Sequence, residues 1–323
     1  MTLIRLGYVA MSTHVPNCSP SQTMTYSQFS KIKDKEAAIR KLERISASNL
    51  QNCWRLLIHN TAYDIQFFRL SSKLIPLVNH PEIPQWDYLE PIADELNKIK
   101  EFLISHPTFR IDFHPDHFVI LNSSNIDILK TSLKTLKMHY MILKKIGLNP
   151  EHRCVLHVGG GYGENESALE QFIHNWGMIP EGIQRMIILE NDDTTFTLSE
   201  TLYLCEKLGI PLVFDYHHYL AHHSKDENWI DDWSRILNTW HHSKSPPKMH
   251  ISSPRNEKEF RAHADYVDVN MFMDFLRHIK GSLPQLDCMI EAKQKDGALF
   301  QLMEQLKEFP EIEIIDGGSF YIH

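Results

Sequence analysis

Short apolar runs alternate along the chain with longer segments in which apolar residues recur every three or four positions. The runs are typical of buried β-strands, because each is short and consists mainly of aliphatic and aromatic residues. The predicted strands are residues 4–9, 54–59, 109–113, 153–158, 186–190, 211–215, 248–251 and 288–290. A segment with helical spacing follows each of these runs, so eight strands and eight helices are expected in strict alternation.

The longer segments have the apolar spacing of amphipathic helices. The clearest is 125–147, which ends at Gly147, a residue suited to a helix C-terminus, and is followed by Pro150. The predicted helices are residues 33–50, 88–105, 125–147, 164–176, 197–209, 229–240, 267–279 and 297–309.

This alternation predicts parallel strands that are joined by right-handed crossovers. Eight such units suit a closed (β/α)8 TIM barrel, and we expect one α/β barrel domain over residues 1–323. An open, doubly wound sheet is the alternative. The first strand lacks the glycine-rich phosphate loop common in that fold, and Gly159, Gly160 and Gly161 follow the fourth strand without its spacing. We therefore interpret these glycines as a strand-to-helix turn.

Composition narrows the class of protein only slightly. Hydrophobic residues make up 42% and charged residues 23% of the chain, as in ordinary soluble globular proteins. No stretch approaches the ~18 apolar residues of a membrane helix, and the first residues lack a signal-peptide pattern. The 5 cysteines include no CxxC pair, which favours a reducing compartment. We expect an intracellular, cytoplasmic protein.

Net charge and histidine content point to different properties. A formal net charge of -8 argues mildly against general phosphate binding, although a basic groove can coexist with an acidic back face. The 20 histidines are well above the roughly 2% expected from ordinary composition. Several of them fall where the predicted strands end.

From the third strand onward, each predicted strand is followed closely by His, Asp or Glu. The carboxyl ends of barrel strands meet at one mouth, so these side chains would share a concave surface. A single histidine of this kind is more often structural, but carboxylates gathered there would repel one another, and divalent cations would remove that cost. The pattern therefore predicts a metal site. The candidate ligands are His114, His157, Glu190, Asp215, His218, His250, His263 and Glu291.

The donor types limit the choice of ion. Imidazole and carboxylate without thiolate suit manganese, zinc or iron(II), and argue against a structural zinc finger. Because eight donors exceed the needs of one ion, we expect two or three divalent ions. Ions ~3.5–4 Å apart stabilise both the attacking and the leaving oxygen in phosphodiester cleavage.

Nine segments, in this order and over nearly the whole chain, resemble the UV damage endonuclease family. They are RLGYV, FRLSSKLIPLVNHP, FHPDHFVIL, VLHVGGGYG, ILEND, FDYHH, PKMHISS, HADYVD and MIEAKQKDGAL. The resemblance implies a TIM barrel similar to endonuclease IV and to xylose isomerase-like barrels, with a cluster of divalent ions that is commonly manganese. It also implies nicking of DNA 5′ to pyrimidine dimers, (6-4) photoproducts and some abasic sites.

The same resemblance assigns roles to individual residues. It makes the eight strand-end residues metal ligands and adds His80, whose other interpretation is a loop histidine before a proline. Lys248 matches a lysine beside the cluster, either as a phosphate contact or, when carbamylated, as a further ligand. A solvated rim lysine is the alternative. Glu190, Lys248 and Glu291 are the catalytic candidates.

Other residues match positions that contact DNA in the family. His117 and Phe118 replace a common Gln-Tyr pair, and an aromatic ring there can stack into the gap left by flipped nucleotides. Core packing is the alternative for Phe118. Tyr8 matches a tyrosine that faces DNA, and Ser12 stands where asparagine is usual. The candidate phosphate contacts, each with a solvated surface residue as its alternative, are Arg69, Lys73, Arg255, Lys258 and Lys293.

The leading hypothesis is a DNA repair endonuclease that acts on damaged double-stranded DNA, without a membrane or an obligate protein partner. An abasic-site endonuclease without photoproduct preference is the second. A sugar isomerase or epimerase on the related barrel is the third, and it would need one or two ions and a sugar-sized pocket. A metal-dependent binding module is the non-enzymatic alternative. The surplus of ligands and the HPDHF loop favour a nuclease.

Overall fold

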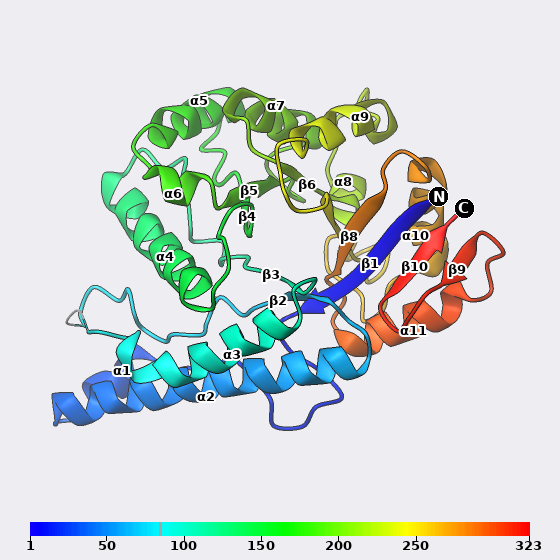
Figure 1. Ribbon diagram of the computed structural model, residues 1–323. Coiled ribbons are helices and arrows are strands. Elements are labelled where there is room, and N and C mark those ends of the chain that lie inside the picture. Colours follow the sequence, from blue (N-terminus) through cyan, green and yellow to red (C-terminus); the bar gives the residue numbers. More distant parts are fainter. Residues whose placement is uncertain (84–85) are drawn as a thin grey trace.

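The computed structural model describes residues 1–83 and 86–323, and eight parallel strands form a barrel at the centre of that part of the chain (Figure 1). They are hydrogen-bonded in the order β3-β2-β1-β8-β7-β6-β5-β4. A parallel bridge between Phe113 and Cys154 joins the two ends of this order, so the barrel is nearly closed. The TIM-barrel prediction is confirmed. The strands are β1 (Thr2–Val9), β2 (Phe67–Arg69), β3 (Arg110–Asp112), β4 (Cys154–His157), β5 (Ile187–Glu190), β6 (Leu212–Asp215), β7 (Lys248–Ile251) and β8 (Gln285–Ile290).

Helices surround the barrel and cover the outer faces of the strands (Figure 1). Their amino ends are stabilised by side-chain caps, such as Asp34, Asn125 and Thr197, whose oxygens accept backbone N–H groups of the first turn. The helices are α1 (Tyr26–Ser30), α2 (Lys35–Ala62), η1 (Glu90–Ile92), α3 (Ala93–Ser105), α4 (Ile126–Lys145), α5 (Asn165–Trp176), α6 (Glu181–Gln184), α7 (Leu198–Leu208), α8 (Tyr216–Ala221), α9 (Trp229–Thr239), α10 (Val269–Ile279) and α11 (Asp296–Leu306). Within the described ranges, no helix is both long and apolar enough to cross a bilayer.

The predicted strand at residues 54–59 is wrong. These residues belong to the last third of α2, and the second strand is β2, further along the chain. Cys53, Leu56 and Leu57 are buried at helical spacing, whereas Trp54 and Ile58 are exposed on the other face. The other predicted strands coincide with observed ones.

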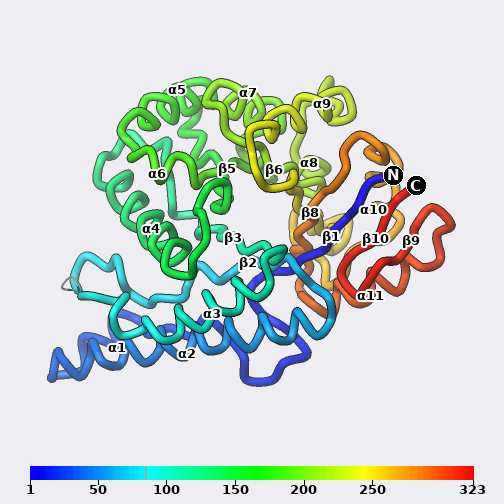
Figure 2. Tube along the Cα trace, in the orientation of Figure 1, coloured from blue at the N-terminus to red at the C-terminus, as the bar shows by residue number. Residues whose placement is uncertain are grey.

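A C-terminal hairpin completes the sheet and was not expected from the sequence. Its strands are β9 (Ile312–Ile314) and β10 (Ser319–Ile322). Strand β10 pairs antiparallel with the first half of β1, so that Thr2 lies opposite Ile322 and the two chain ends are neighbours (Figure 2). Phe320 and Ile322 are fully buried, and the hairpin therefore protects the backbone edge of β1.

The barrel interior contains an apolar cluster and a chain of charges. Val155, Ile188, Val213 and Trp240 form the apolar cluster. The chain of charges starts at Arg5, whose Nε lies 2.7 Å from Asp287 Oδ1. It continues through Arg110 to Asp112 and Lys248 by contacts of 2.9, 3.0 and 3.2 Å. Buried charges of this kind are tolerated because each has an opposite partner.

Candidate metal centre

Strand geometry brings the predicted ligands together inside the barrel. His157, Glu190 and Asp215 each follow a residue of the apolar interior cluster by two positions. Side chains two apart on a strand point to the same face, so these three also point inward, nearer the carboxyl ends of the strands. In the parallel register His157 lies beside Glu190, and Asp215 lies beside His250.

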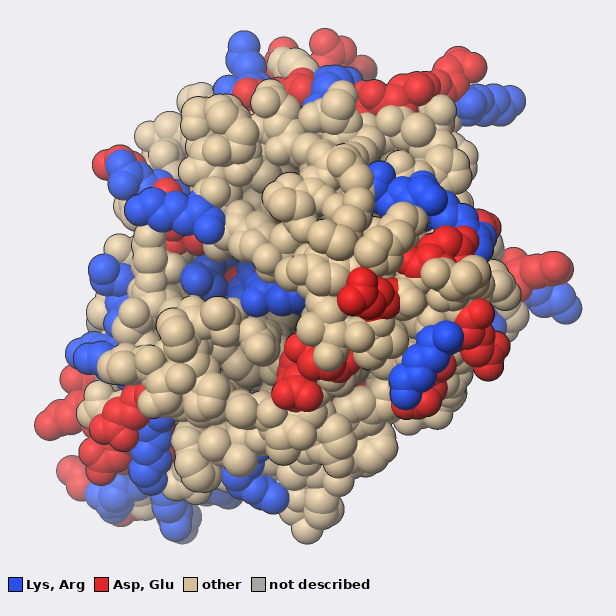
Figure 3. All heavy atoms as spheres, turned by 45° about the vertical axis from the view of Figure 1, so that its right-hand side comes forward, with Lys and Arg blue, Asp and Glu red and all other residues tan. Residues whose placement is uncertain are grey.

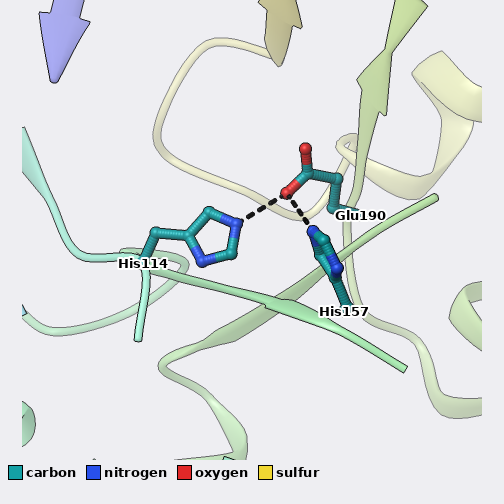
Figure 4. A group of neighbouring side chains, drawn as sticks. All are labelled: His114, His157 and Glu190. Atoms are coloured by element: carbon teal, nitrogen blue, oxygen red, sulfur yellow. Dashed lines mark hydrogen bonds and ion pairs between the residues drawn. The ribbon is translucent and has the colours of Figure 1, made fainter. Parts of the chain in front are cut away.

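Glu190 is the centre of the group, and its carboxylate contacts four histidines. Its Oε2 lies 2.8 Å from His114 Nε2 and 3.3 Å from His157 Nε2 (Figure 4). Its Oε1 lies 2.7 Å from His250 Nδ1 and 3.5 Å from His218 Nδ1. Although burial raises the pKa of Glu190, His250, His114 and His157 hold that pKa well below its usual range.

The remaining ligands extend this centre toward β8. Glu291 Oε1 lies 3.1 Å from His250 Nδ1, and the Nδ1 atom of His263 lies 3.1 Å from the Glu291 carbonyl oxygen. The rings of His218 and His263 have centroids 6.1 Å apart. All eight predicted strand-end ligands therefore lie at one mouth.

The residues present fit divalent cations. Two triads have donor atoms that lie within 4.8 Å of one another, and both include Glu190: one with His114 and His157, the other with Asp215 and His250. Asp215 Oδ2 and His250 Nε2 are buried in the described structure and have no hydrogen-bond partner. A buried acceptor without a partner is costly, and a coordinated cation would satisfy both atoms.

The electrostatics of the centre support the same interpretation. Burial, together with the charges of Glu190 and Glu291, raises the pKa of Asp215 to about 6. Burial lowers the pKa of His250 to about 4, whereas for His218 the charges of Asp215 and Glu190 overcome burial and raise the pKa to about 9. Carboxylates that repel one another at this distance are stabilised by cations.

Asn191 orients two candidate ligands, Asp215 and His218, and was missed by sequence reasoning. Its carbonyl oxygen lies 3.0 Å from His218 Nδ1. Its side chain donates to the carbonyl of Asp215 at 3.0 Å and accepts the Asp215 N–H at 2.9 Å. Partners of this kind fix the tautomer and orientation of a ligand. The only sequence signal for it was its place directly after Glu190.

His80 is not brought to the other ligands. It lies in the loop after β2, and its ring stacks on Tyr26 with centroids 4.3 Å apart. Its Nδ1 accepts the N–H of Glu82 at 3.2 Å. The described residues therefore hold His80 in a local aromatic contact outside the cluster.

Lys248 points into the barrel, so its alternative as a solvated rim lysine is wrong, whereas its contact with a phosphate stays a prediction. Only 2% of the residue is exposed. Its Nζ lies 3.2 Å from Asp112 and 5.5 Å from the centre of the Phe67 ring. Burial lowers the pKa of Lys248 to about 8.

Of the residues expected to contact DNA, His117 and Phe118 are accessible to solvent, whereas Tyr8 and Ser12 make hydrogen bonds within the protein. Phe118 is 61% exposed beside the exposed His117, so its alternative as a core residue is wrong. Tyr8 is fully buried and donates to Asn60, so it cannot face DNA in this structure. The hydroxyl of Ser12 donates to Asp296, which leaves it no free proton for DNA.

The candidate phosphate contacts differ in their surroundings. Arg69 is buried and donates to Glu291, whereas Arg255 pairs with Glu259 at 2.9 Å. Basic and acidic side chains are mixed over the face in Figure 3, so that face is not uniformly basic. The candidates that are exposed without a described side-chain partner are Lys73, Lys258 and Lys293.

Fold and site together define a TIM-barrel protein with a candidate divalent-metal centre at the mouth formed by its strand ends. The model of the UV-endonuclease UvdE family matches residues 4–320. The chain therefore belongs to this family.

Individual relatives agree with that assignment. The UV DNA damage endonuclease of Halalkalibacterium halodurans is 52% identical over 318 residues, which is 98% of each chain. The crystal structure of SacUVDE is 28% identical and superposes with a TM-score of 0.82 over 94% of this chain and 98% of that one. Endonuclease IV from Thermus thermophilus is only 12% identical, with a TM-score of 0.55 over 94% of this chain and 100% of that one, and shares the fold.

Proposed function

We propose that this protein is an endonuclease that nicks duplex DNA 5′ to UV lesions by hydrolysing a phosphodiester at the centre around Glu190. The lesions are pyrimidine dimers and (6-4) photoproducts, with some abasic sites. The observation that carries the proposal is the contact of one buried carboxylate with four histidines at the barrel mouth. Membership of the UV-endonuclease UvdE family supports the choice of substrate.

The predicted ligands are proposed to hold two or three divalent ions together. Manganese is the proposed metal, and zinc and iron(II) are the alternatives. Glu190 is shared between the two donor triads. Neutral imidazoles suit a cation, and the lowered pKa of His250 keeps its ring neutral near pH 7. Bound ions would lower the pKa of a coordinated water and neutralise charge on the phosphodiester. The ligands are His114, His157, Glu190, Asp215, His218, His250, His263 and Glu291, with His80 as a proposed addition that requires its loop to move.

Lys248 is proposed to support this centre from inside the barrel. Its ammonium balances Asp112 below the ligands. Carbamylation requires a neutral amine, and a pKa of about 8 makes that form more accessible than in a solvated lysine.

His117 and Phe118 are the proposed lesion probe. An exposed ring at the mouth can stack against bases that have left the helix, and an exposed imidazole can donate a hydrogen bond. Lys73, Arg255, Lys258 and Lys293 are proposed phosphate contacts on neighbouring loops. Arg69 is proposed to act at the centre itself, through Glu291.

A single assay tests the proposal. The protein is incubated with Mn²⁺ and three duplexes of the same sequence, which carry one thymine dimer, one abasic site or no damage. We expect a nick on the 5′ side of the dimer and no nick in the undamaged duplex. Nicking of the abasic duplex alone would indicate an abasic-site endonuclease. Failure to nick any duplex, with turnover of a ketose sugar, would indicate an epimerase.

A further inference from the structure

The loop after β7 reaches the candidate ligand His263 through an exposed segment, residues 255–262. A bridge between Pro254 and His263 brings the two ends of this segment together. The N–H of Arg255 also donates to the Ala262 carbonyl oxygen at 2.7 Å. The segment therefore leaves the barrel and returns to it beside the metal centre. We call residues 255–262 the arm.

Almost all hydrogen bonds of the arm stay within it. Asn256 Oδ1, for example, accepts the N–H groups of Lys258 and Glu259 at 3.0 and 2.9 Å. Within residues 1–83 and 86–323, a single hydrogen bond joins the arm to the rest of the protein. In this bond, His217 Nε2 donates to the Phe260 carbonyl oxygen at 2.7 Å. The position of the arm therefore depends on one imidazole.

His217 lies between the arm and the metal centre. It is fully buried on α8, directly before the candidate ligand His218. Its ring meets the ring of His263 edge-on, with centroids 5.3 Å apart, and its centroid lies 6.0 Å from that of the Phe260 ring. One side chain thus packs against both the arm and a candidate ligand.

The arm has the side chains of a nucleic-acid contact. Phe260 is 38% exposed, and Lys258 and Arg261 are exposed without an ion pair to a described residue. Exposed Lys and Arg bind backbone phosphates, and unpaired bases stack on exposed rings. The charge of the arm is slightly positive, although the whole chain carries -8. Its three basic residues outnumber its two acidic ones, with Arg255, Lys258 and Arg261 against Glu257 and Glu259.

We propose that the arm binds the DNA backbone beside the metal centre and that His217 is the positioning residue that fixes the arm there. This inference rests on the proposed function and adds His217, Phe260 and Arg261 to that site. Without the hydrogen bond from His217, the arm samples other positions. DNA then has to order the arm on binding, and that ordering costs affinity.

The test of the arm compares Lys258→Gln with Lys207→Gln, which removes the same charge from the far end of α7. Affinity for a dimer-containing duplex is measured between about 50 and 200 mM salt, with EDTA present so that the duplex is not nicked. We expect Lys258→Gln to weaken binding and to reduce the salt slope by about 0.9. Lys207→Gln should change neither quantity. Equal salt slopes in the two variants would overturn the arm as a DNA contact.

The role of His217 is tested by a double-mutant cycle with Lys258→Gln. His217→Leu removes the donor, and we expect it to weaken DNA binding roughly tenfold. Lys258→Gln should then add little further loss, because the arm is no longer held in place. His217→Gln, whose amide can donate to the same carbonyl, should restore both the affinity and the full effect of Lys258→Gln. Additive losses in the cycle would overturn the positioning role.

Two further outcomes keep the test decisive. If His217→Leu does not fold, His217→Asn takes its place, because its shorter amide does not reach the Phe260 carbonyl. If the wild-type protein nicks no duplex, the proposed function fails. If it nicks the dimer-containing duplex and Lys258→Gln binds that duplex as tightly as Lys207→Gln, only this inference fails.

Discussion

At the scale of single residues, the centre depends most on Glu190, because it belongs to both donor triads and contacts four histidines. Replacing Glu190 by Gln preserves the shape but removes the charge and turns one acceptor into a donor that faces imidazole nitrogens. We expect at least ~100-fold loss of nicking and a comparable loss of Mn²⁺ affinity, since even residues that only orient ligands cost 10–100-fold. Quantitative nicking assays and Mn²⁺ titration measure both. Glu304→Gln, an exposed change on α11, serves as the control. Activity near that of the control would remove Glu190 from the site.

His139 predicts a pH dependence of stability that is separate from the metal centre. It is fully buried against Phe113, and burial lowers its pKa to about 4 from 6.5. The unfolded chain therefore takes up a proton below about pH 6.5 that the folded chain does not bind until about pH 4. The free energy of unfolding should fall as pH falls through this window, by about 1.4 kcal/mol per pH unit, and should not depend on His139 above it.

Urea unfolding of the wild type and of His139→Gln at pH 7.5 and 5.5 isolates this effect, because other titrating groups are common to both proteins. The stability advantage of the wild type should be smaller at pH 5.5 by about 1 kcal/mol. If the wild type is more stable than His139→Gln by the same amount at both pH values, His139 is protonated in the folded state or accessible to water.

For single residues, the sequence could predict which side chains lie at the ends of the barrel strands. The positions of the candidate ligands His114, Glu190 and Glu291 follow from one rule, that strand ends meet at one mouth. The partners of side chains could not be predicted in the same way. Tyr8 is held by Asn60, and Ser12 by a residue 284 positions away. Such contacts depend on which distant segments the fold brings together.

At the scale of elements, the loop after β3 offers the clearest prediction. Phe118 is exposed and contributes little to the core, so Phe118→Ala should leave the melting temperature nearly unchanged. Loss of an aromatic ring that stacks on a base costs ~1–3 kcal/mol, so affinity for dimer-containing DNA should fall roughly tenfold. Tyr203→Ala, which removes a similarly exposed ring from α7, is the matched control. Equal affinities of the two variants would exclude a stacking role for Phe118.

Besides the C-terminal hairpin, which was not expected, the second strand was predicted in the wrong place. The run Trp54-Arg-Leu-Leu-Ile-His59 is as apolar as a strand, and short apolar runs do not distinguish a strand from a buried helical face. Observed strand β2 has only 3 residues, too few for any periodicity. Its length is set by hydrogen bonds to β1 and β3, which lie far from it in the sequence.

At the scale of the whole molecule, the proposed ligands come from the ends of six consecutive strands, β3 to β8, or from the loops that follow them. Strands β3 and β4 have the fewest paired residues of any two neighbours in the barrel, because a single bridge joins them. His114 and His157 lie on either side of this seam and both contact Glu190. Ions bound here would therefore link the two edges that backbone hydrogen bonds join least.

Removal and return of metal should accordingly change global stability. An ion that binds only the folded state at a hundred times its Kd stabilises it by about 2.7 kcal/mol, which corresponds to a rise of roughly 5 °C in the melting temperature for a chain of this size. We expect EDTA-treated protein to gain such a rise on addition of Mn²⁺, measured by calorimetry. Glu190→Gln should lose most of it. If the melting temperature of that variant rises equally, the stabilising ions bind elsewhere than at Glu190. The chemistry proposed for this mouth of the barrel would then lose its metal site.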